Sequence, residues 1–159
     1  MAWVYYNGAI SLSWPNDYSF GDIVVDYQDT SGSPLSGAYD IKVTTNNYGG
    51  WQPASENWSF DITGCQYLTF ALKPTQANQT WASAFLYVGD IATGIVLDLP
   101  NAAYGPATPT VGQWNVYKIP LADYFPNGVV PQTIYKFFLQ DSTGTANTWY
   151  LDNVGFTAN

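Results

Sequence analysis

Tyr67-Leu68-Thr69-Phe70-Ala71-Leu72-Lys73 is the stretch of sequence that most clearly indicates the fold. Leu68, Phe70 and Leu72 occupy every second position, so an extended chain places them together on one face. The residues between them are mostly polar or small and fall on the other face. The stretch therefore predicts a β-strand with one buried face.

Similar short runs recur along the whole chain, separated by clusters of turn residues such as Ser31-Gly32-Ser33-Pro34 and Asn46-Asn47-Tyr48-Gly49-Gly50. Eight or nine short strands punctuated in this way predict an all-β fold, an antiparallel β-sandwich. The length of 159 residues predicts one domain spanning 1–159. The predicted strands are Trp3–Tyr6, Asp22–Tyr27, Ile41–Thr45, Tyr67–Lys73, Ala84–Val88, Ile95–Leu99, Trp114–Pro120, Ile134–Gln140 and Thr148–Phe156.

The charge balance excludes several classes of partner. Twelve acidic residues face four basic ones, and the net charge is −8. Nucleic acids and anionic membranes are bound through basic side chains, so this protein should bind neither. No apolar run is long enough to span a membrane. The start of the chain lacks the features of a signal peptide and is typical of an excised module with an added Met. The expected partner is neutral, or a cation.

The residue inventory also disfavours catalysis. The chain has no His and one cysteine, Cys65, so imidazole-dependent nucleophiles and zinc sites are not expected. A glycosidase needs two carboxylates, and jelly-roll glycosidases generally use two glutamates. This chain has one glutamate, Glu56. We therefore expect no enzyme activity, although a pair of aspartates stays open as an alternative.

Aromatic residues make up 18% of the chain and divide into two groups. Phe70, Phe85, Phe137 and Trp114 lie at alternating strand positions and are expected in the core. Others lie beside polar loops, where large rings are costly unless they cover or bind something. Aromatic planes match the C–H faces of sugars, and amides and hydroxyls match the sugar hydroxyls. The members of this second group are Trp14, Trp51, Trp81 and Tyr104.

Asp152 is a carboxylate inside an apolar terminal strand, in Tyr150-Leu151-Asp152-Asn153-Val154. Such a group needs a partner, and the four lysines are too few to pair with every acid. Ca²⁺ accepts carboxylate, amide and carbonyl oxygens and suits such a place. The alternative is that Asp152 accepts hydrogen bonds from loop amides.

An ordered set of motifs resembles the β-jelly-roll carbohydrate-binding modules that are appended to bacterial glycoside hydrolases. The set spans nearly the whole chain, and each motif alone is weak. Its members are Val4-Tyr5-Tyr6-Asn7, Leu35-Ser36-Gly37-Ala38-Tyr39-Asp40-Ile41-Lys42-Val43-Thr44, Tyr48-Gly49-Gly50-Trp51, Gln66-Tyr67-Leu68-Thr69-Phe70, Gln113-Trp114-Asn115-Val116-Tyr117-Lys118-Ile119-Pro120-Leu121 and Trp149-Tyr150-Leu151-Asp152-Asn153-Val154.

The resemblance implies a jelly-roll of two antiparallel sheets that binds a neutral plant cell-wall polysaccharide: a β-glucan, cellulose, xyloglucan, mannan or xylan. It implies a secreted, monomeric module of a larger multimodular enzyme. It also implies one structural Ca²⁺, with Asp152 as a ligand and the Gly37 backbone and Asn7 close by. Asn7 replaces the family's usual aspartate, which removes a charge from the site.

For the sugar itself we expect Trp51 and Trp81 to stack on the rings. Trp14, Tyr48 and Tyr104 are secondary platforms, and Gln140 offers hydroxyl contacts from the strand face opposite Phe137 and Leu139. Trp51 has an alternative role as a buried plug at the end of the sandwich. Three other functions stay open: a small glycoside hydrolase, a structural or adhesive interaction module, and an accessory domain that has lost its ligand.

Overall fold

The computed structural model describes residues 3–6, 16–54, 60–77, 81–86, 97–98, 102–125, 127–134, 137–141 and 144–159. Within these ranges the chain is built of strands and one short 3₁₀ helix, η1 (Leu121–Tyr124). No helix of the described part is long and apolar enough to cross a membrane. The strands are β1 (Trp3–Tyr6), β2 (Asn16–Asp17), β3 (Phe20–Asp29), β4 (Asp40–Trp51), β5 (Pro53–Ala54), β6 (Phe60–Asp61), β7 (Tyr67–Pro74), β8 (Trp81–Leu86), β9 (Leu97–Asp98), β10 (Asn115–Pro120), β11 (Thr133–Ile134), β12 (Phe137–Asp141) and β13 (Asn147–Thr157).

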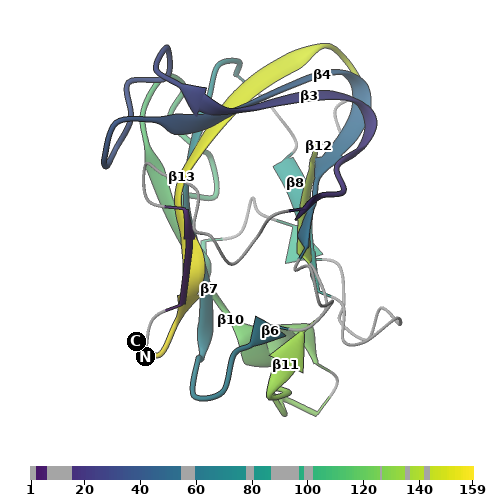
Figure 1. The fold of residues 1–159 in the computed structure, drawn as a ribbon, viewed down its shortest axis with the longest axis vertical. Coiled ribbons are helices and arrows are strands. Elements are labelled where there is room, and N and C mark those ends of the chain that lie inside the picture. The colour runs from purple at the N-terminus through teal and green to yellow at the C-terminus, as the bar shows by residue number, and fades with distance from the viewer. Residues whose placement is uncertain are drawn as a thin grey trace.

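Nine of the described strands form one antiparallel sheet, with the order β10-β7-β13-β4-β12-β8-β9, β1 added at β13 and β3 at β4. Figure 1 shows β13 and β7 on one side of the molecule, β12 and β8 on the other, and β3 and β4 arching between them. The predicted β-sandwich is confirmed. Its two layers are continuous rather than separate, because β4 pairs with β13 through residues 41–45 and with β12 through residues 49–51.

The core lies between the two layers and is rich in aromatic rings. Phe137 makes edge-to-face contacts with Trp51 and Phe156, with ring centroids 5.7 and 5.5 Å apart. Phe70 stacks on Tyr117 at 5.2 Å. Phe70 and Phe137 are therefore core residues, as their alternating positions predict. Edge-to-face and offset geometries let these rings fill the space at favourable electrostatic energy.

Two other sequence predictions are wrong: that Trp114 lies in the core and that residues 46–50 form a turn. Trp114 is half-buried on the outside, where its indole N–H donates to the Ser33 carbonyl at 3.0 Å and its ring lies 5.8 Å from the Lys73 ammonium. The predicted turn at residues 46–50 is part of β4. Pairing with β3 and β12 keeps this polar, glycine-containing stretch extended, and local turn propensity does not decide it.

Candidate functional site

Trp51 is not a surface platform. Its side chain is fully buried, and its indole N–H donates to the Tyr27 hydroxyl at 3.0 Å. Because Leu139 is its register partner on β12, Trp51 lies on the core side of the sheet. The expectation of a stacking role is wrong, and the alternative of a buried plug is correct.

The other predicted platform residues are not brought together. Trp14 lies outside the described residues, and of Trp81 only the backbone, at the start of β8, is described. Tyr104 is half-buried against the core, and its carbonyl accepts the Lys118 backbone N–H at 2.7 Å. It therefore lies beside β10, apart from Tyr48 and Gln140.

Tyr48 and Gln140 do share a face with two rings outside the predicted set, those of Phe20, which is 37% exposed, and Phe138, which is half-buried. Phe20, Gly50 and Gln140 are register partners across β3, β4 and β12. Phe138, two residues before Gln140, makes an edge-to-face contact with Phe20, with ring centroids 5.2 Å apart. We call the surface made by Tyr18, Phe20, Tyr48, Phe138 and Gln140 around Gly50 the Phe20–Phe138 face.

Two features of the sequence produce this face: the alternation of buried and exposed residues along β12, and the glycine at position 50 of β4. Along β12, Phe137 and Leu139 are buried while Phe138 and Gln140 are partly exposed. A Cβ at Gly50 would overlap the Phe20 ring, so only glycine lets this ring lie against the backbone of β4. The register therefore brings an aromatic pair and an amide to one outer surface.

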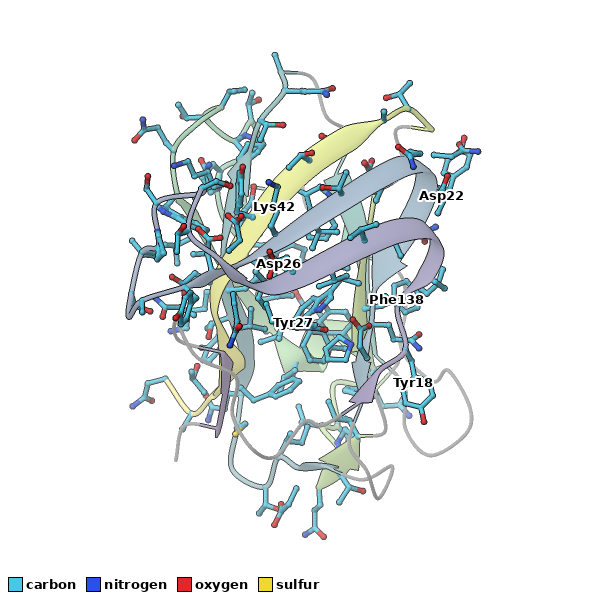
Figure 2. All side chains as sticks on the ribbon, turned by 45° about the horizontal axis from the view of Figure 1, so that its top comes forward. Tyr18, Asp22, Asp26, Tyr27, Lys42 and Phe138 are labelled. Carbon is cyan, nitrogen blue, oxygen red and sulfur yellow. The ribbon has the colours of Figure 1, made fainter. Side chains whose placement is uncertain are left out.

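Tyr18 and Tyr48 extend the face. The Tyr18 backbone N–H donates to the Gln52 backbone carbonyl at 2.9 Å. The side-chain amide of Gln52 donates back to the Tyr18 backbone carbonyl at 3.1 Å. Tyr18 is 42% exposed and Tyr48 is 56% exposed. Figure 2 shows Tyr18 and Phe138 on the same side of the molecule. The face thus offers apolar rings with phenol and amide groups.

Two signals in the sequence pointed to the missed rings. Phe138 shares strand parity with Gln140, which had already been placed opposite Phe137 and Leu139. Tyr18 and Phe20 have the same two-residue spacing just before a predicted strand. The strand predicted from the sequence begins only at Asp22, so it does not include these two rings.

Asp152 accepts hydrogen bonds from loop amides, which is the alternative to a calcium ligand that its sequence position leaves open. Its Oδ2 accepts the backbone N–H groups of Leu35 and Ser36 at 2.9 and 2.8 Å. Its Oδ1 accepts the Ser36 hydroxyl at 3.2 Å and the Asn153 N–H at 2.7 Å. The Asp152 carboxylate is thus surrounded by three N–H groups and by the Ser36 hydroxyl, which also lies 2.7 Å from the Asn153 side-chain oxygen. Of the rest of the predicted set, Asn7 is outside the described residues and Gly37 has a positive φ of 65°.

A second carboxylate beside Asp152 is unsatisfied. Asp40 is fully buried, and neither of its side-chain oxygens has a hydrogen-bond partner. It pairs with Asp29 across β3–β4 and lies one residue beyond the Ile41–Leu151 pair of β4–β13. Burial, the carboxyl of Asp29 within hydrogen-bonding reach, and the charges of Asp29 and Asp152 raise the pKa of Asp40 to about 7. We call Asp29, Asp40 and Asp152 the aspartate row.

Asp29 differs from Asp40 because it has donors. Burial opposes its ionisation, but hydrogen bonds from the Ser31 hydroxyl, the Gly32 N–H and the Asp40 carboxyl, and the charge of Lys42, lower the pKa of Asp29. The Lys42 ammonium is 3.7 Å from its Oδ1. Negative charge therefore persists at Asp29, next to the buried Asp40 carboxyl, which is within hydrogen-bonding reach of it.

Several solved structures that share this fold are carbohydrate-binding modules. The family 11 module of the cellulosomal cellulase Lic26A-Cel5E of Clostridium thermocellum matches with a TM-score of 0.65 and 16% sequence identity, over 100% of this chain and 95% of that one. The family 11 module from Clostridium thermocellum in complex with a β-1,3-1,4-mixed-linked tetrasaccharide matches with a TM-score of 0.63 and 15% identity, over 98% and 95%. A family 29 module in complex with mannohexaose matches with a TM-score of 0.65 and 10% identity, over 100% and 92%.

Comparison of the sequence with family models and with curated proteins finds no match. The structural similarity nevertheless covers the whole chain. The sequence motifs that resemble such modules also extend over nearly the whole chain. The chain therefore has the β-sandwich fold of the carbohydrate-binding modules.

Proposed function

We propose that the protein is a non-catalytic carbohydrate-binding module that binds a neutral β-linked polysaccharide on the Phe20–Phe138 face. The observation that carries the proposal is the partly exposed aromatic pair of Phe20 and Phe138 beside Gln140, held at 5.2 Å between ring centroids. Rings fixed before the ligand arrives lose little conformational entropy on binding. Their planes suit the C–H faces of sugars, and the Gln140 amide suits hydroxyl groups.

Charge supports a neutral ligand. The net charge is −8, and the described lysines Lys42, Lys73 and Lys118 lie on strands and positions outside the Phe20–Phe138 face. Recognition of acidic sugars relies on cationic side chains, above all on arginine, which binds carboxylates in a bidentate way. This chain has no arginine. Uncharged glucans and mannans, xyloglucan and xylan therefore remain the ligand class.

The ligands of the similar modules suggest which polysaccharides to test first. One was solved with a β-1,3-1,4-mixed-linked tetrasaccharide and another with mannohexaose. We infer by analogy a β-glucan or a mannan for this chain, and a role within a secreted, multimodular enzyme in which the module is monomeric. Trp14 and Trp81 remain proposed additional platforms.

The first prediction concerns the ring pair. Phe20→Ala and Phe138→Ala should each weaken binding of the best polysaccharide at least tenfold, about 1.4 kcal/mol, because each removes stacking area. Affinity electrophoresis over mixed-linkage β-glucan, xyloglucan, glucomannan and xylan would identify the ligand. Calorimetry with its hexasaccharide would then give the Kd of each variant.

Tyr39→Ala is the matched control, since Tyr39 is 38% exposed and Phe20 is 37% exposed. Tyr39 lies beyond the other end of the β3–β4 hairpin, about 30 Å away along ten strand residues. Its loss should leave affinity unchanged. Equal loss in Tyr39→Ala, or full affinity in both phenylalanine variants, would contradict the proposed face. Release of reducing sugar above background by the pure protein would instead indicate a hydrolase.

A further inference from the structure

A buried polar cluster lies directly beneath the Phe20–Phe138 face. Asp141 is fully buried, and its Oδ2 accepts the Thr45 hydroxyl at 3.2 Å and the Asn147 side-chain amide at 2.8 Å. Asp141 follows Gln140 on β12, and neighbouring residues of a strand point to opposite sides of the sheet. The cluster therefore lies on the core side of the strands whose outer side carries the face.

The cluster occupies the point where β4 changes partners. Residues 41–45 of β4 pair with β13, and residues 49–51 pair with β12. Residues 46–48, between them, have no register partner on β3, β12 or β13 in the described part of the chain. Thr45 holds one end of this segment, and Gly49, the register partner of Asp141, holds the other. The cluster therefore fixes the chain on both sides of residues 46–48.

Tyr48 ends this segment and is a member of the Phe20–Phe138 face. A Cβ at Gly21 would overlap the Tyr48 carbonyl oxygen, and a Cβ at Gly144 would lie 2.9 Å from the Tyr48 hydroxyl. Both glycines have a positive φ, 84° and 68°, which other residues rarely adopt. Gly144 belongs to the loop between β12 and β13, and the hydrogen bond from Asn147 to Asp141 closes this loop. The segments that enclose Tyr48 therefore meet at Asp141.

We infer that Asp141 is a positioning residue of the sugar-binding face: through Thr45 and Asn147 it holds Tyr48 and Gln140 in place, and it does not touch the ligand. The inference rests on the proposed function, because it explains how the Phe20–Phe138 face is held ready for a sugar. Side chains that are fixed before the ligand arrives lose less conformational entropy on binding. A loosened Tyr48 should therefore bind sugar more weakly.

The test compares sugar affinity with stability in variants of the full chain. Asp141→Ala should weaken binding of the hexasaccharide of the best polysaccharide about tenfold, measured by calorimetry at a temperature at which the variant is folded. Asp141→Asn keeps an acceptor oxygen for both donors and should bind within about threefold of the parent.

Asn115→Ala is the matched control for stability. Asn115 is also buried, and its side chain donates to the Thr110 and Gln113 carbonyls. It lies on β10, whose neighbour β7 is not part of the face. This variant should melt at a lower temperature than the parent, as Asp141→Ala should, but its affinity for the sugar should be unchanged.

Thr45→Val is a milder variant, because it removes one hydroxyl donor and keeps the shape of the side chain. It should weaken binding about threefold. Thr44→Val is its control, since the Thr44 hydroxyl lies on the outer side, 3.4 Å from that of Thr148, and its loss should leave affinity unchanged. In a double-mutant cycle, Asp141→Ala and Tyr48→Ala together should lose less affinity than the sum of the two single losses.

A readout without ligand separates this inference from the proposed function. The NMR signals of the Tyr48 ring should shift or broaden in Asp141→Ala but not in Asn115→Ala. Unchanged Tyr48 signals, full affinity in Asp141→Ala, an equal loss of affinity in Asn115→Ala, or strictly additive losses in the cycle would each overturn the inference. A parent protein that binds none of the polysaccharides contradicts the proposed function instead, and the Tyr48 signals still decide whether Asp141 holds this side chain.

Discussion

Replacing Trp51 with alanine should lower the free energy of unfolding by about 3–5 kcal/mol, as for other fully buried aromatic residues. The ring is completely buried and makes an edge-to-face contact with Phe137. Its loss leaves a cavity between the layers and removes the donor to the Tyr27 hydroxyl, 3.0 Å away. Urea unfolding followed by circular dichroism would measure the change.

Tyr48→Ala is the control for this prediction. Tyr48 lies three residues before Trp51 on β4 and is 56% exposed, so its truncation should change stability by no more than about 0.5 kcal/mol. Trp51→Phe should fall between the two, because it keeps a ring but loses the hydrogen bond. If Trp51→Ala lowered the free energy of unfolding by less than about 1 kcal/mol and abolished sugar binding, Trp51 would be a binding platform and not a buried plug.

The second large effect is expected at Asp152. Asp152→Ala should lower the free energy of unfolding by on the order of 3 kcal/mol, since hydrogen bonds to a charged group are worth about 1.5–3 kcal/mol each. The variant leaves the N–H groups of Leu35 and Ser36 without their acceptor. Relief of repulsion with Asp40 offsets part of the loss. Unfolding measured in EDTA separates this effect from any bound Ca²⁺.

Asp22→Ala provides the comparison for Asp152, because Asp22 is an exposed carboxylate on β3. Its removal should be close to neutral. Backbone hydrogen exchange gives a second readout, since the amides of Leu35 and Ser36 should lose protection in Asp152→Ala. Normal protection of these two amides would show that the clamp is not formed in solution.

Much of the fold follows from local alternation. The stretch at Tyr67–Lys73 is β7, and the predicted strands at residues 41–45, 114–120 and 148–156 correspond to β4, β10 and β13. Side-chain period, which is set within each strand, was enough to identify them. Phe70 and Phe137 were placed in the core for the same reason.

The candidate site was less predictable because its composition depends on register. Trp51 follows two glycines and has the local features of an exposed ring, but pairing with Leu139 turns it inward. Phe20 becomes a surface ring because Gly50, thirty residues later, leaves space for it. Exposure of a ring at the end of a strand is decided by partners that the local sequence does not show.

Composition and a period of two residues are properties of the chain alone, and they were enough to predict an acidic, histidine-free, all-β domain. Which aromatic side chains face solvent and which aspartates meet depends on contacts between distant parts of the chain. Asp29, Asp40 and Asp152 come from three strands, and the last is more than a hundred residues from the first. Long-range pairing brings such groups within a few ångströms of each other, and their burial and electrostatics exist only after that pairing has formed.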